Sequence, residues 1–98
     1  MKILPAYKLR VPDSVATLVR SLHPQLKRKI RTGLDLILKD PLCGKLLKDE
    51  LKDLRSLRVF KFRIVYRLAE RVIEIISIGP RETIYRETYR QLKQDTSL

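Results

Sequence analysis

The sequence has few of the residues on which metal sites and many active sites depend. Its 98 residues include one cysteine, Cys43, and one histidine, His23. A lone cysteine excludes a disulfide within the chain and a zinc site with several cysteine ligands. A lone histidine excludes a paired-histidine metal site and leaves only His23 for a nucleophile–histidine pair. We therefore expect no metal ion and no cofactor.

Glycine-rich loops and long apolar segments are also lacking. The three glycines, Gly33, Gly44 and Gly79, are too scattered to form a phosphate-binding loop. The longest apolar run, residues 72–79, contains two polar residues and is too short to span a bilayer. The N-terminus lacks the apolar core of a signal peptide. These absences predict a cytoplasmic protein that does not associate with membranes.

Basic residues, in contrast, are abundant. The chain has 22 Lys and Arg against 11 Asp and Glu, a net charge of +11, which favours polyanionic partners such as nucleic acid or acidic protein segments. No acidic residue lies between Asp13 and Asp35. The basic residues of that stretch are Arg20, Lys27, Arg28, Lys29 and Arg31. A solvated helix face would explain this cluster as well as a binding surface would.

The first half of the chain predicts a short strand and a helical hairpin. Residues 6–11 alternate apolar and basic side chains, as in a strand. Apolar spacing predicts one helix over residues 13–22 and a second from Pro24 to Asp40, separated at His23 because the residue before a proline disfavours helical angles. Each helix has a single apolar stripe, so the pair must pack on another layer.

The second half predicts that layer. Residues 41–53 read as a loop with a short helical piece at 46–51, followed by strands from Leu54, over 62–68 and over 72–78, with a hairpin turn at 69–71. A last helix is expected over 81–93, before a polar tail. The predicted class is α+β, in the order β-α-α-β-β-β-α, with the two-helix hairpin on a small, mostly antiparallel sheet. Residues 1–98 are expected to form one domain.

The strand over residues 62–68 predicts two unlike faces, because successive side chains of a strand point to opposite sides. Its apolar face carries Phe62, Ile64, Tyr66 and Leu68. The other face presents Arg63 and Arg67. We expect the apolar face to cover the helices and the arginine face to be concave and basic.

Cleavage of RNA without metal or histidine needs a base, an acid and cations that stabilise the charged phosphorane. Arginine binds phosphate through two parallel hydrogen bonds, and a tyrosine can act as the base where neighbouring cations lower its pKa from about 10. Arg63 lies on the strand, Arg81 follows the next strand, and Tyr85 lies four residues later, as a neighbour of Arg81 if both are helical. Simpler roles, in solvation for Arg63 and in packing for Tyr85, remain open.

Residues 54–68 and 72–85 together resemble the RelE/ParE superfamily of bacterial toxins. The matching residues are Leu57, Arg58, Phe62-Arg63-Ile64-Val65-Tyr66, Gly79-Pro80-Arg81 and Tyr85. RelE-like members cut messenger RNA in the ribosomal decoding site, whereas ParE-like members poison DNA gyrase and lack the catalytic residues. The order of the predicted elements also resembles that of the superfamily.

The resemblance implies a toxin of the RelE branch, a ribosome-dependent messenger RNA endonuclease. Arg63 and Arg81 would contact the scissile phosphate, Arg81 would protonate the leaving oxygen, and Tyr85 would be the base for attack by the 2′-hydroxyl, with Tyr89 as the next candidate. Further RNA-binding candidates are Arg55, Arg58, Lys61, Arg67, Lys27, Arg28 and Arg31. Two alternatives remain open: a gyrase inhibitor without nuclease activity, and an RNA-binding relative that has lost catalysis.

The sequence departs from the superfamily at two places. Leu54 and Ser56 stand where RelE nucleases commonly carry lysines, and Phe60 stands where the hairpin turn usually has glycine. The resemblance also implies partners: the ribosome and messenger RNA, a cognate antitoxin whose acidic or disordered C-terminal segment folds around the toxin, and operator DNA only through the antitoxin complex.

Overall fold

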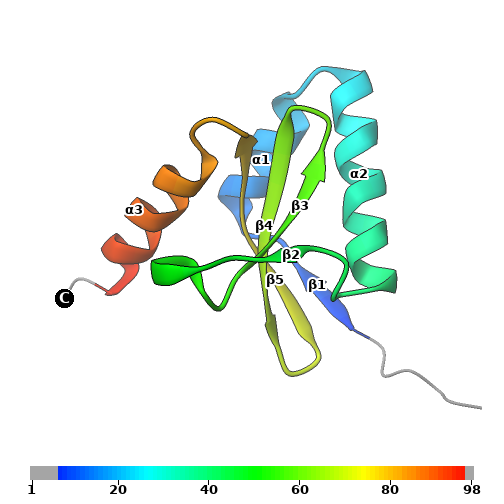
Figure 1. Ribbon diagram of the computed structural model, residues 1–98. Coiled ribbons are helices and arrows are strands. Elements are labelled where there is room, and N and C mark those ends of the chain that lie inside the picture. Colours follow the sequence, from blue (N-terminus) through cyan, green and yellow to red (C-terminus); the bar gives the residue numbers. More distant parts are fainter. Residues whose placement is uncertain (1–6, 97–98) are drawn as a thin grey trace, which may run out of the picture.

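The computed structural model describes residues 7–96 as a five-stranded sheet with helices on both faces (Figure 1). The elements are β1 (Lys8–Arg10), α1 (Asp13–Ser21), α2 (Pro24–Lys39), β2 (Lys45–Leu46), the 3-10 turn η1 (Asp49–Leu51), β3 (Arg55–Val59), β4 (Phe62–Ala69), β5 (Val72–Pro80) and α3 (Ile84–Thr96). This confirms the predicted α+β class and element order, with the short strand β2 in addition. No helix within residues 7–96 is long and apolar enough to cross a membrane.

The strand order is β1-β5-β4-β3-β2, in which β1 runs parallel to β5 and all other neighbours are antiparallel. The predicted turn between β4 and β5 is confirmed, with Glu70 at φ 56°, and the turn between β3 and β4 has Phe60 at φ 58°. A bulge interrupts the β4–β5 pairing, since Val65 pairs with Ser77 but Tyr66 pairs with Ile75. The extra residue, Ile76, therefore lies on the face opposite Ile75.

The main core lies between the helical hairpin and one face of the sheet. Its buried members are Val15, Ile30, Ile37, Val59, Ile64, Tyr66, Ile73, Ile75 and Ile78. The predicted apolar face of residues 62–68 is therefore confirmed. Gly33 lets α2 approach closely, because a Cβ there would lie 2.8 Å from the Val59 side chain.

The junction between the two helices also follows the sequence. His23 caps α2, because its Nδ1 accepts a hydrogen bond from the Gln25 N–H at 3.2 Å, and Pro24 occupies the first helical position. α1 ends at Ser21, so the predicted break at His23 is confirmed.

The arginine face of β4 is partly covered by a helix. α3 packs on that side of the sheet, over a second buried cluster of Leu54, Val65, Ile76 and Ile84. α3 also begins at Ile84 instead of residue 81 and continues to Thr96, and Lys45–Leu46 pairs with β3 as β2 instead of forming loop. The hydrogen bonds that place β2 come from residues distant in sequence, which local pattern does not reveal.

Candidate functional site

A cleft of about 330 Å³ opens beside the start of α3, on the sheet face opposite the helical hairpin. Its lining residues are Lys45, Leu46, Leu47, Lys48, Arg63 and Tyr85. The guanidinium carbon of Arg63 lies 5.8 Å from the centre of the Tyr85 ring, within the range of a cation–π contact. The cleft thus joins a tyrosine to three cations.

Arg63 is held in the middle of the sheet. It pairs in register with Arg58 of β3 and with Gly79 of β5. Its side chain is half-buried, and its Nε is buried without a hydrogen-bond partner among the residues that the structure describes. A buried donor without an acceptor costs about 1–3 kcal/mol, so an acceptor such as a phosphate oxygen would be stabilised there.

Tyr85 reaches the cleft from the first turn of α3. Its ring packs against the second cluster, and its hydroxyl donates a hydrogen bond to Ser56 Oγ at 3.1 Å. Ser56 is buried on β3, so the Tyr85 hydroxyl is fixed toward the sheet. The close approach of α3 depends on Gly79, where a Cβ would lie 2.9 Å from the Ile84 side chain.

Lys45 and Lys48 were not predicted as site residues. β2 is positioned by Tyr66, whose hydroxyl donates to the Pro41 carbonyl at 2.8 Å and accepts from the Gly44 N–H at 2.9 Å. Burial raises the pKa of Tyr66 to about 12. Arg55 holds the same loop, because its guanidinium donates to the Gly44 carbonyl at 2.9 Å.

Arg81 does not line this cleft. It is exposed in the turn between β5 and α3, where its backbone N–H donates to the Lys61 carbonyl at 2.9 Å. Because α3 begins only at Ile84, the expected helical spacing between Arg81 and Tyr85 is wrong. The structure brings together Arg63 and Tyr85, with Arg81 outside the lining.

The predicted RNA-binding residues are spread over several surfaces. Arg67 lies on the cleft side of β4, but it forms an ion pair with Glu74 at 3.3 Å. Arg55 is bound to the loop before β2, Arg58 lies near the end of β3, and Lys61 lies in the β3–β4 turn. The remaining three belong to α2, on the other face of the sheet: Lys27, Arg28 and Arg31.

The signal that would have found Lys45 and Lys48 lies in the short run Lys45-Leu46-Leu47-Lys48, which puts two lysines around an apolar pair. As for metals, the described residues 7–96 contain no group of three or more His, Cys, Asp or Glu side chains that could hold an ion.

The fold is that of RelE-type toxins. A mutant of the E. coli toxin RelE in the free state matches with a TM-score of 0.73 and 19% identity, over 94% of this chain and 99% of that chain. RelBE2, a toxin–antitoxin complex from Mycobacterium tuberculosis, matches with a TM-score of 0.67 and 22% identity, over 78% of this chain and 99% of that chain. The YoeB–YefM complex from Staphylococcus aureus matches with a TM-score of 0.62 and 21% identity, over 74% of this chain and 94% of that chain.

These likenesses show that the chain has this fold, and the class of protein is shown by a family match. Residues 10–85 match the family described as ParE toxin of type II toxin-antitoxin system, parDE. The chain therefore belongs to this family and is the toxin of a toxin–antitoxin system. No curated protein matches it in sequence.

Proposed function

We propose that this toxin is a ribosome-dependent messenger RNA endonuclease that acts in the cytoplasm, and that the cleft beside α3 is its active site. The observation that carries the proposal is the position of Arg63 5.8 Å from the Tyr85 ring, in a cleft with two lysines on its wall. The solved relatives support the fold alone. The whole of residues 1–98 would form one toxin domain.

The proposed reaction uses the 2′-hydroxyl of the message as nucleophile. Tyr85 in its phenolate form takes the hydroxyl proton, the oxygen attacks the adjacent phosphorus, and the bond to the 5′-oxygen of the next nucleotide breaks. Arg63 donates hydrogen bonds to the phosphate oxygens, where negative charge increases in the transition state. Lys45 and Lys48 lie on the same cleft wall and add positive charge for the RNA backbone.

Arg81 is the proposed second phosphate cation and the acid for the leaving oxygen. Gly79 is the register partner of Arg63, and Arg81 follows two residues later in the turn, so its side chain begins at the end of the strand that neighbours Arg63. Within the described residues no hydrogen bond or ion pair holds the Arg81 side chain, and it would close on the phosphate when RNA binds. The reaction as proposed requires no metal ion or cofactor.

The antitoxin is the proposed protein partner. Two of the similar structures, RelBE2 and YoeB–YefM, are toxin–antitoxin complexes. The net charge of +11 favours an acidic antitoxin segment. Binding to operator DNA would pass through the antitoxin complex, and the ribosome with its message would be the target of the free toxin.

The family description favours a second candidate. The matched family is named for ParE and parDE, and the resemblance associates ParE-like toxins with DNA gyrase. A gyrase inhibitor would use the basic surface to bind protein or DNA and would not need Tyr85 as a base. An inactive RNA-binding relative would bind ribosomes without producing new message ends.

Induced expression without the antitoxin separates the candidates. The nuclease proposal predicts that translation stops before DNA replication and that messages acquire new 5′ ends inside ribosome-bound codons. Replication that stops first, with DNA breaks and intact messages, would favour gyrase. Cleavage should also persist after zinc and manganese are removed, with magnesium retained to keep the ribosome intact. A specific need for either removed metal would contradict the proposed chemistry.

A further inference from the structure

The outer side of α3 carries a tyrosine among three basic residues. Figure 1 shows α3 at the periphery of the molecule, and the side that packs on the sheet includes Ile84 and Thr88, which are 1% and 0% exposed. The exposed residues on the outer side, which we call the α3 stripe, are Arg86, Tyr89, Arg90 and Lys93. Packing within the chain therefore does not explain the choice of these four residues.

Tyr89 is the member of the stripe whose exposure is least expected. Its side chain is 39% exposed and belongs to neither apolar cluster of the described residues, whereas Tyr85 and Leu92 of the same helix pack on the second cluster. The Lys93 Nζ lies 5.6 Å from the centre of the Tyr89 ring, as a cation–π contact. An exposed ring beside a cation offers a flat face on which a nucleic-acid base can stack.

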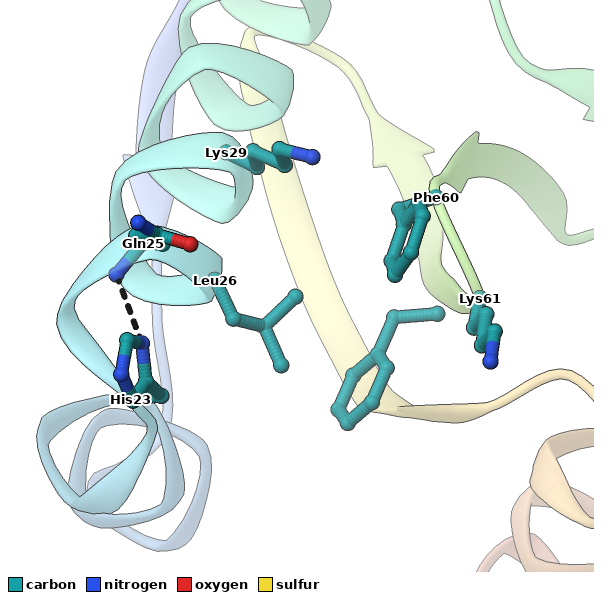
Figure 2. A pocket seen from close by; sticks show the side chains of 7 residues that line it. His23, Gln25, Leu26, Lys29, Phe60 and Lys61 are labelled. Atoms are coloured by element: carbon teal, nitrogen blue, oxygen red, sulfur yellow. Dashed lines mark hydrogen bonds between the residues drawn. The ribbon is translucent and has the colours of Figure 1, made fainter.

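A second exposed ring, that of Phe60, has a different setting. Lys29 and Lys61 lie 4.4 and 5.7 Å from its centre, and Figure 2 shows the ring in a hollow opposite Leu26 of α2. Tyr89 is not among the residues that line this hollow or the cleft. Its ring lies on the outer side of a single helix, where a flat base can reach it, and a role beside the cleft suits it better than the role of base.

The charges close to Tyr89 have one sign. At roughly 100° per residue around the helix, Arg86, Arg90 and Lys93 all lie within about 100° of Tyr89. Glu87 is turned by about 160° from Tyr89 and lines a hollow between α1 and α3. Among the side chains that the structure describes, none forms an ion pair with Arg86 or Arg90. A stripe of this kind favours the phosphate backbone of a nucleic acid.

The stripe is continuous with the cleft. Tyr85 lines the cleft from the first turn of α3, and Tyr89 follows four residues later, about 6 Å further along the helix and about 40° round it. Neighbouring nucleotides of one RNA strand can span that separation. A strand with its scissile phosphate at Arg63 can therefore place an adjacent base at Tyr89.

We propose that the α3 stripe is a second RNA-binding site, at which Tyr89 stacks on a base of the message next to the cut and the three cations bind its phosphates. The proposal rests on the proposed function, because it assumes RNA in the cleft. Every base has a face on which a ring can stack, and phosphate contacts carry no sequence information. The site therefore raises affinity for the message and leaves the chemical step to the cleft.

Affinity for ribosomes programmed with a message tests the proposal. The message carries 2′-deoxynucleotides in the codon at the decoding site, so that it binds and is not cut. Tyr89→Leu removes the flat ring, Tyr89→Phe keeps it, and Arg90→Gln removes one cation of the stripe. Arg71→Gln is the matched control, since it makes the same charge change in the exposed turn between β4 and β5. Urea unfolding confirms that each purified variant is folded.

We expect Tyr89→Leu to weaken binding by about tenfold, and Tyr89→Phe and Arg71→Gln by no more than about threefold. Arg90→Gln should lower the slope of log affinity against log salt concentration by about 0.7, the value for one lost contact with a single-stranded phosphate. Equal affinities of the wild type and Tyr89→Leu would overturn the proposal. Equal losses in Tyr89→Leu and Tyr89→Phe would also overturn it, because stacking needs the ring and not the hydroxyl.

Two further results would assign the stripe to another partner and overturn the proposal. A loss in Tyr89→Leu that is equally large on ribosomes without message would point to ribosomal RNA. Weaker binding of the antitoxin, with unchanged binding to programmed ribosomes, would point to a protein contact. Failure of the nuclease proposal is distinguishable, because it appears as wild-type toxin that leaves an unmodified message intact, whatever the variants do to binding.

Discussion

The two faces of the sheet are built differently. The face under α1 and α2 is covered by a single apolar cluster that reaches from Val15 to Ile78. Among the described residues, the face under α3 has four buried apolar side chains, and the buried polar residues Ser56, Ser77 and Thr88 lie among them or beside them. The first face therefore supplies most of the folding free energy, and the second accommodates the polar groups that a reaction needs.

α3 is attached to its face by polar contacts as well as by the apolar packing of Ile84, Tyr85 and Leu92. The Thr88 hydroxyl donates to the Ile84 carbonyl at 2.7 Å, which leaves Ser77 as the donor in the 2.6 Å bond between the two hydroxyls. The Gln91 amide donates to the Ile76 carbonyl at 3.3 Å. Each such bond contributes about 1 kcal/mol, less than the burial of a large aliphatic side chain.

The largest expected effect compares the same substitution on the two faces. Ile30 of α2 is 0% exposed and Ile84 of α3 is 1% exposed. Removing buried methyl groups costs about 2–5 kcal/mol, and more where the surroundings cannot collapse. We expect Ile30→Ala to cost close to the upper end of this range. Ile84→Ala should cost close to the lower end, because α3 can shift to fill the space that the side chain leaves. Urea unfolding measures both, and equal losses would show that the two faces are equally well packed.

The next effect compares two arginines of β4 that share the cleft side. Arg63→Ala should lower message cleavage by roughly a hundredfold or more, as expected for loss of a transition-state cation. Arg67→Ala should change it less than about threefold, because Arg67 is paired with Glu74 and does not line the cleft. Single-turnover cleavage on programmed ribosomes measures both, and similar losses would refute the assignment of the cleft.

Much of the fold could be predicted from sequence because its signals are local. The alternation around Ile64 and the His23-Pro24 break follow from strand geometry and proline sterics. The start of α3 and the strand β2 could not be predicted, because Ile84 packing over Gly79 and the Tyr66 bonds to the loop at residues 41–44 are tertiary contacts. Strand parity and the family motif placed Arg63 near Tyr85. The run Lys45-Leu46-Leu47-Lys48 is visible in the sequence, but its place in the cleft depends on the tertiary contacts of β2.

A smaller effect concerns Tyr66, which joins the main core to the loop before β2. Tyr66→Phe removes the partner of the buried Gly44 N–H, which should cost about 1–3 kcal/mol. Burial raises the pKa of Tyr66 to about 12 from its ordinary 10.0, so folding favours the protonated phenol. The stabilisation is therefore complete below pH 10 and is lost as pH rises toward 12. The difference in unfolding free energy between wild type and variant should shrink over that range, and a constant difference would contradict the assigned cause.

The smallest effect concerns the ion pair of Arg67 with Glu74. The arginine side chain is 41% exposed, so the pair is screened by solvent. We expect Glu74→Gln to cost less than about 1 kcal/mol at low salt and almost nothing at high salt. Thermal melting at two ionic strengths measures this, and a large loss independent of salt would mean that the α3 face depends on this pair for stability.

The cleavage rate of the Tyr85→Phe toxin tests the central claim most directly. The substitution keeps the ring that packs on the second cluster and removes only the hydroxyl that bonds to Ser56. If Tyr85 is the base, cleavage of ribosome-bound message should fall by about a hundredfold or more, whereas the free energy of unfolding should fall only by the roughly 1 kcal/mol of the lost hydrogen bond. A Tyr85→Phe toxin that cuts messages as fast as the wild type would contradict the account and leave Tyr85 with a packing role alone.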